Sequence, residues 1–128
     1  MGGKKILIVD DETRIRELLE LRLSSEGYEV IQAKDGEEGV MMAKKHLPDL
    51  ILMDVMMPKM DGSEAVEELK EDAATQDIPV IFLTSMITKE EEENQAFGIH
   101  LDVKKHHFIA KPFDTPSLLA EIQKALNK

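Results

Sequence analysis

Five short apolar segments recur along the chain, separated by longer stretches in which apolar residues return with helical spacing. They occupy residues 4–9, 28–33, 49–53, 79–83 and 107–110 and are enriched in β-branched or aromatic residues. Four of the five are apolar throughout, which is typical of parallel strands covered on both faces. The pattern therefore predicts five buried strands.

The stretches between these strands carry helix signals. A first helix is expected to have one apolar face, formed by Ile15, Leu18, Leu19 and Leu23. Gly27 is expected to close this helix. A second helix is expected over residues 37–46, because Pro48 cannot continue it. Two residue pairs have the spacing of a capping box and predict a third and a fourth helix: Asp61 with Glu64, and Thr88 with Glu91.

A fifth helix is expected near the C-terminus. Thr115 followed by Pro116 has the pattern of an N-cap and a first-turn proline. The apolar residues that this helix should bury are Leu119, Ile122 and Leu126. Five β–α units in series predict a parallel sheet with right-handed crossovers.

Polar residues follow four of the five strands. They are Asp10 and Asp11, Asp54, Thr84 and Ser85, and Lys111. In open α/β sheets the ligand site lies outside the carboxyl ends of the strands. A strand order of 2-1-3-4-5 would make these four strands neighbours and gather the polar residues into one crevice. The sequence therefore predicts an α/β fold, a doubly wound five-stranded parallel sheet of (βα)5 type in that order.

The side chains expected in this crevice suit a hard cation and a phosphoryl group. Two or three carboxylates with a backbone carbonyl and waters can hold Mg²⁺, which commonly binds few carboxylates together with a phosphate oxygen. Lys111 and the hydroxyl of Thr84 could hold other phosphoryl oxygens. One carboxylate remains to act as a nucleophile.

Composition narrows the function classes. The 128 residues suit one domain, and 16 basic against 26 acidic residues give a net charge of −10, which disfavours direct binding to nucleic acid or to an anionic membrane. The absence of cysteine excludes thiol chemistry. The N-terminus has no signal-peptide pattern. We expect a single cytoplasmic domain over residues 1–128, without an effector domain.

Four motifs together resemble the receiver domain of the two-component response regulators, the family that includes chemotaxis receivers. They are "VDD" (9–11), "DLILMDVMMPKMDG" (49–62), "PVIFLTS" (79–85) and "KPF" (111–113). The resemblance covers essentially the whole chain and carries a flavodoxin-like fold.

The resemblance implies a role for each matching residue. Asp54 would accept a phosphoryl group from a histidine kinase or a histidine phosphotransfer protein. Mg²⁺, or Mn²⁺ in its place, would be held by Asp10, Asp11, Asp54 and the backbone carbonyl of Met56. Lys111 would bind the phosphoryl group and Thr84 would turn towards it. Thr84 and Phe108 would form the conformational switch.

The same resemblance implies a signalling module in place of a general enzyme: it would catalyse only its own phosphorylation and dephosphorylation. Output would pass to a downstream protein target, and the module would be a monomer or a dimer formed on phosphorylation. The chain departs from the family at "GIHLDVKKHHF" (98–108), which is longer and more basic than usual.

Two other functions have specific sequence requirements. A phosphatase of the haloacid dehalogenase type also has a strand-end aspartate and Mg²⁺, but it needs a general acid two residues later, where this chain has Met56. A flavin mononucleotide carrier needs a hydroxyl-rich phosphate loop after the first strand, where this chain has "DDETR" (10–14). His106 and His107 are adjacent in a strand and cannot form one metal site.

The resemblance also predicts a long-lived phosphoryl group. Met56 and Met86 lie two residues after Asp54 and Thr84, at positions that in receivers flank the path of the attacking water. Thioethers orient water poorly and carry no base. Met56→Asn or Met86→Glu should therefore hasten loss of the phosphoryl group in a decay time course. Equal decay of the native protein and the double variant would contradict this.

Overall fold

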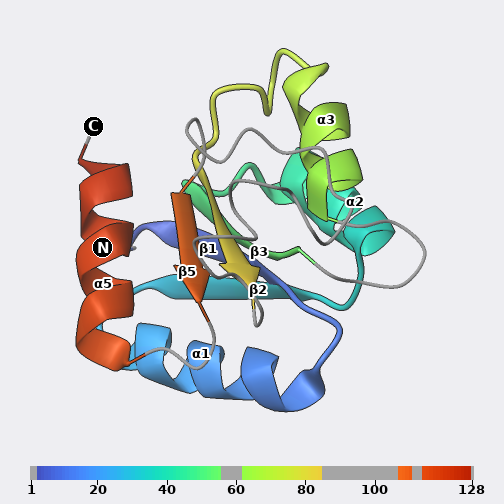
Figure 1. The fold of residues 1–128 in the computed structure, drawn as a ribbon. Helices are drawn as coiled ribbons and strands as arrows, with labels where there is room; N and C mark the ends of the chain where they lie inside the picture. The colour runs from blue at the N-terminus through green and yellow to red at the C-terminus, as the bar shows by residue number, and fades with distance from the viewer. Residues whose placement is uncertain (1–2, 56–61, 85–106, 111–113, 128) are drawn as a thin grey trace, which may run out of the picture.

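A five-stranded parallel sheet forms the centre of the protein, in the order β2-β1-β3-β4-β5 (Figure 1). The computed structural model describes residues 3–55, 62–84, 107–110 and 114–127. The strands are β1 (Lys5–Val9), β2 (Glu29–Ala33), β3 (Leu50–Asp54), β4 (Val80–Thr84) and β5 (His107–Ala110). Each lies within one residue of its expected bounds, and the predicted order is confirmed.

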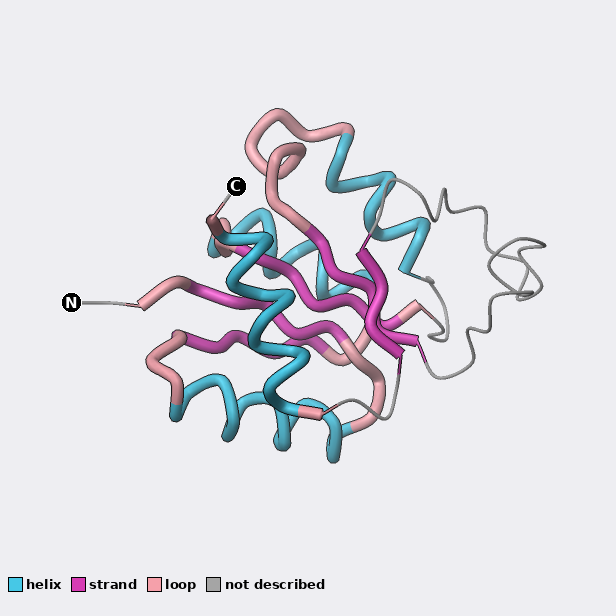
Figure 2. Tube along the Cα trace, turned by 60° about the vertical axis from the view of Figure 1, so that its left-hand side comes forward, coloured by secondary structure: helices cyan, strands magenta, loops and turns pink. Residues whose placement is uncertain are grey.

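Helices cover both faces of the sheet, as a doubly wound fold requires (Figures 1 and 2). In the described part of the chain they are α1 (Thr13–Ser25), α2 (Gly36–His46), α3 (Gly62–Lys70) and α5 (Thr115–Leu126). One apolar cluster joins α1 and α5 to the sheet, and a second joins α2 and α3 to the opposite face.

The alternation of side chains along β1 explains why the strand is apolar throughout. Ile6 and Ile8 pack in the cluster with α1 and α5, while Leu7 and Val9 pack in the cluster with α2 and α3. Successive strand residues point to opposite faces. Because both faces of this central strand are covered, neither set can be polar.

Gly27 was expected to close α1, and it does so two residues after Ser25, the last residue of the helix. Gly27 has a φ of +93°, a conformation that glycine adopts without strain, and its N–H donates to the carbonyl of Ser24 at 3.0 Å. The expected apolar face is wrong at one residue, since Leu18 remains 38% exposed while Leu19 is fully buried. Adjacent helix residues point about 100° apart, so only one of the two can face the sheet.

The start of α5 differs by one residue from the expectation. Asp114, not Thr115, is the N-cap, and its carboxylate accepts from the backbone N–H and the hydroxyl of Ser117, each at 2.9 Å. These two hydrogen bonds hold the pKa of Asp114 below its ordinary value. The carboxylate offers one oxygen to each of the two donors, and its negative charge strengthens both hydrogen bonds.

The buried face of α5 also differs from the expected one. Leu118, Ile122 and Ala125 are buried, while Leu119 and Leu126 are only partly buried and pack at the margin of the core. Only Ile122 of the expected set is therefore central. The spacing of four and then three residues keeps the observed face along one side of the helix.

Some expectations fall outside the described residues. These are the cap at Asp61 and the fourth helix with its Thr88 and Glu91. Among the helices that the structure describes, none is long and apolar enough to cross a membrane.

A close contact between α2 and β1 depends on Gly39. A β-carbon added at this position would lie 2.8 and 2.9 Å from the two methyl carbons of Val9, closer than packed atoms approach. The helix therefore lies directly on the strand at the residue before Asp10.

The N-terminus of α2 is also fixed, because the carboxylate of Asp35 accepts from the N–H of Glu38 at 2.8 Å.

We predict that Gly39→Ala destabilises the protein by about 1–3 kcal/mol, because the new methyl group overpacks against Val9. At an open helix position the same change would stabilise by roughly 1 kcal/mol. The effect should reverse sign in a Val9→Ala background, which removes the two methyl carbons. Urea unfolding of the four proteins measures both effects. The same change in free energy of unfolding in the two backgrounds would show that this contact is not tight.

Candidate functional site

The pairing of β1 with β3 brings Asp10 and Asp54 together. Val9 pairs with Met53 in a parallel register, and each is followed directly by an aspartate, Asp10 and Asp54. Both aspartates consequently lie at the carboxyl edge of the sheet, next to each other. Two strands that are far apart in sequence thereby form one site.

Asp10, Asp11 and Asp54 form a cluster of carboxylates. One carboxylate oxygen from each lies within 4.8 Å of those from the other two. Asp10 is fully buried and Asp54 is 5% exposed, while Asp11 is exposed at the surface. The structure thus brings together the three acids that the sequence placed at one edge of the sheet.

A tight turn after β1 sets the direction of Asp10. Its Oδ1 accepts from the N–H of Glu12 at 2.9 Å, an arrangement typical of aspartate in turns. The carbonyl of Glu12 then accepts from the N–H groups of Ile15 and Arg16 and begins α1. The carboxylate is therefore held by the same turn that starts the helix.

Arg16 is a residue of the site that the sequence did not reveal. Its Nη1 donates to the backbone carbonyl of Asp10 at 2.6 Å, and its Nε donates to Oε1 of Gln32 at 3.1 Å. The sequence does show an arginine in the first turn of the helix that follows the acidic strand end. Its partner Gln32 lies in β2, however, and no local pattern links the two.

Electrostatics make this cluster unfavourable unless positive charge is near. Two unit charges about 5 Å apart repel by roughly 3 kcal/mol at an effective dielectric constant of about 20. Asp10 and Asp54 are buried, so water screens them little. The donors are all carboxylate oxygens, which are the ligands that Mg²⁺ prefers. The residues present therefore fit a hard divalent cation.

The remaining predicted site residues are placed less completely. Thr84 is the last residue of β4 and pairs with Ala110, and the neighbouring Leu83 pairs with Asp54. The backbone of Thr84 therefore adjoins this edge of the sheet. Phe108 lies in β5 and pairs with Phe82.

Several predicted residues lie outside the described part of the chain. They are Met56, Ser85, Met86, His106 and Lys111, together with most of the basic segment 98–108. Their roles stay predictions from the sequence.

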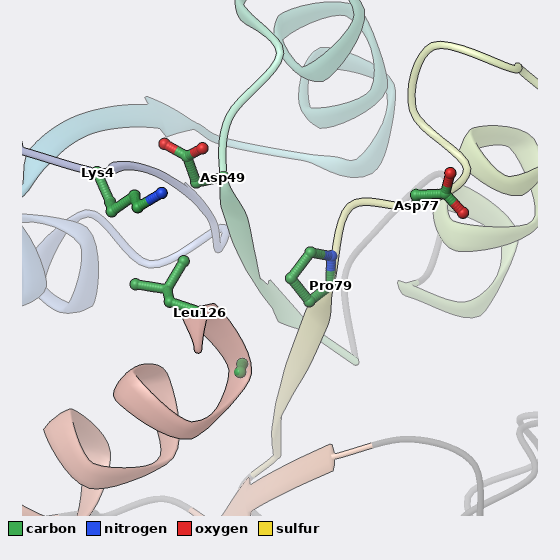
Figure 3. Close-up of a pocket in the computed structure, with 6 residues that line it drawn as sticks. Lys4, Asp49, Asp77, Pro79 and Leu126 are labelled. Atoms are coloured by element: carbon green, nitrogen blue, oxygen red, sulfur yellow. The ribbon is translucent and has the colours of Figure 1, made fainter. Parts of the chain in front are cut away.

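A pocket of about 240 Å³ lies at the opposite edge of the sheet (Figure 3). Its lining residues are Lys4, Asp49, Asp77, Pro79, Ala125 and Leu126. Lys4, Asp49 and Pro79 directly precede β1, β3 and β4, so the pocket lies at the amino ends of these strands. It is therefore separate from the carboxylate cluster and does not enlarge it.

Comparison with known proteins places the chain in a family. The family model for the response regulator receiver domain matches residues 6–123. The phosphate regulon transcriptional regulatory protein PhoB of Pseudomonas aeruginosa is 41% identical over 128 residues, which are 100% of this chain and 54% of that protein. A probable transcriptional regulator, ycf27 of Porphyridium aerugineum, is 39% identical over 100% of this chain and 50% of its own length.

Solved structures agree with this assignment. The chemotaxis protein CheY4 of Vibrio cholerae has a TM-score of 0.82 and 32% identity, covering 98% of this chain and 100% of that one. The receiver domain of the sensor histidine kinase PA1611 of Pseudomonas aeruginosa has a TM-score of 0.84 and 29% identity, covering 99% and 100%. That structure holds a magnesium ion coordinated in its active site cleft.

The chain spans about half the length of the curated relatives it matches. The matched region includes the carboxylate cluster. It also includes all of the described sheet except Lys5. The family match, the relatives and the fold agree, and this chain belongs to the family of response regulator receiver domains.

Proposed function

We propose that Asp54 accepts a phosphoryl group from a histidine kinase or a histidine phosphotransfer protein, and that the chain then signals to a protein partner. The observation that carries this proposal is the meeting of Asp54 with Asp10 and Asp11 at the carboxyl edge of the sheet. Membership of the receiver family supplies the class of reaction.

The proposed ligands of Mg²⁺ are the carboxylates of Asp10, Asp11 and Asp54 with the backbone carbonyl of Met56. Their support is the all-oxygen donor set and the burial of two of the three acids. When bound, Mg²⁺ would neutralise charge on the phosphoryl oxygens. Mn²⁺ prefers similar ligands and is proposed as a substitute.

Asp54 is the proposed nucleophile. One of its oxygens would bond to phosphorus as the bond between phosphorus and the donor's imidazole nitrogen breaks, and the electron pair of that bond stays with the imidazole. Lys111 and the hydroxyl of Thr84 are proposed to hold phosphoryl oxygens. The proposed chemistry is limited to this transfer and to loss of the phosphoryl group, because Met56 offers no general acid.

The proposed output surface lies beyond β4. Thr84 and Phe108 are in the paired strands β4 and β5, so we propose that a change at the carboxylate cluster reaches this end of the sheet through these two strands. The relative named as the DNA-binding dual master transcriptional regulator RpaA of Synechocystis is a longer protein. For residues 1–128 we propose a single receiver domain, monomeric or dimerising on phosphorylation, whose net charge of −10 disfavours direct contact with DNA.

We predict that the native protein gains the mass of one phosphoryl group when incubated with Mg²⁺ and a small phosphodonor, and that Asp54→Asn does not. Asp77→Asn is the matched control, because it makes the same chemical change at the opposite edge of the sheet. Intact mass spectrometry measures the outcome. Phosphorylation of Asp54→Asn to the native extent would place the acceptor elsewhere.

We predict that Mg²⁺ binds weakly without phosphate and that Asp11→Ala abolishes this binding. The expectation is weak binding because Mg²⁺ keeps several waters when few carboxylates hold it. Calorimetric titration of the native protein and the variant gives both affinities. Equal affinities would remove Asp11 from the metal site.

A further inference from the structure

The guanidinium of Arg16 contacts the backbone of the carboxylate cluster. Nη1 donates to the carbonyl oxygen of Asp10 at 2.6 Å and Nη2 donates to Oγ1 of Thr13 at 3.3 Å. Nε donates to Oε1 of Gln32 at 3.1 Å. Each of these three acceptors is a neutral oxygen, so these three contacts are directional hydrogen bonds and not ion pairs.

Gln32 of β2 and Glu20 of α1 keep this arginine in place. Oε1 of Gln32 accepts from Arg16, and Nε2 of the same amide donates to a carboxylate oxygen of Glu20. Because the amide has different partners at its two ends, its orientation is defined. Arg16 therefore spans from β2 to the turn after β1 as a rigid fork.

The carbonyl oxygen of Asp10 belongs to the peptide plane that joins Asp10 to Asp11. A hydrogen bond to this oxygen restricts rotation on both sides of the plane, at ψ of Asp10 and at φ of Asp11. The carboxylate of Asp10 is additionally fixed by burial and by the N–H of Glu12. Asp11 is exposed, so the direction in which its Cα–Cβ bond leaves the backbone depends on this peptide plane.

We infer that Arg16 is a positioning residue of the metal site, which aims the carboxylate of Asp11 by clamping the Asp10–Asp11 peptide. This inference rests on the proposed function, in that Asp10, Asp11 and Asp54 bind Mg²⁺. Outer residues that orient metal ligands commonly change metal affinity by about 10- to 100-fold when they are replaced.

The charge of Arg16 and its hydrogen bonds are expected to have opposite effects on the affinity for Mg²⁺. A positive side chain beside a cation site repels the cation, so loss of the charge alone would strengthen Mg²⁺ binding. Loss of the clamp would weaken binding. Arg16→Lys separates the two further, because it keeps the charge but cannot span both the Asp10 carbonyl and Gln32 with a planar fork.

The choice of metal gives a readout that general loss of stability does not change. Mg²⁺ requires nearly ideal octahedral geometry, whereas Ca²⁺ accepts irregular arrangements of oxygen ligands. A clamp that sets ligand direction should therefore matter more for Mg²⁺ than for Ca²⁺. The ratio of the two affinities reports positioning directly.

The experiment is calorimetric titration of the full chain with Mg²⁺ and with Ca²⁺. Arg16→Ala and Arg16→Lys should each weaken Mg²⁺ binding by about tenfold or more, and should lower the preference for Mg²⁺ over Ca²⁺. Arg14→Ala is the matched control, because it removes the same charge from an exposed position on the same turn of α1. This control should leave the Mg²⁺ affinity unchanged or slightly raised.

Gln32→Met keeps Arg16 and its charge but removes the second acceptor, and it should weaken Mg²⁺ binding in the same direction by a smaller factor. It also serves if the Arg16 variants unfold, because Gln32 lies one strand away from the turn. Native affinity in Arg16→Lys and Gln32→Met would overturn the inference and leave the metal site intact. Failure of the native protein itself to bind Mg²⁺ would overturn both.

Discussion

The repulsion between the buried carboxylates of Asp10 and Asp54 is the constraint around which this edge of the domain is organised. Neither group can move into water, because each terminates a strand that is covered on both faces. The pairing of β1 with β3 fixes their separation. The hydrophobic core therefore offsets the unfavourable energy of holding two like charges together, because its packing stabilises the sheet whether or not a cation is bound at the site.

That core also determines which parts of the site are rigid. The close approach of α2 at Gly39 places backbone directly over Val9, and the alternating residues of β1 lock into two separate clusters. A strand held in this way cannot rotate without displacing helices on both faces. Asp10 and Asp54 are consequently positioned by packing, before any ligand is considered.

Strand positions and order were predictable because both follow from short-range patterns combined with one topological rule: apolar runs mark buried strands, and polar strand ends select the order that gathers them. The errors have equally local causes. Thr115 and Asp114 are both acceptable N-caps, and the choice between them depends on which acceptor reaches Ser117. The buried face of α5 has a separate cause, because Leu118 and Leu119 are both apolar and only packing against the sheet decides that Leu118 is the buried one. Arg16 was missed for a different reason, since its partner Gln32 becomes a neighbour only when β2 pairs with β1.

The three carboxylates are thus held by unequal means. Asp54 depends on the sheet, and Asp10 depends on burial and on its hydrogen bond with the N–H of Glu12, while the exposed Asp11 has only the backbone of the turn to set its direction. A metal site needs all its ligands in place at once, so its geometry is limited by the least constrained of them. Hydrogen bonds to a peptide plane can supply that constraint without placing any further group in the first coordination sphere. An arginine next to a cation site is otherwise unfavourable, and its donation to a backbone carbonyl gives a physical reason for finding it there.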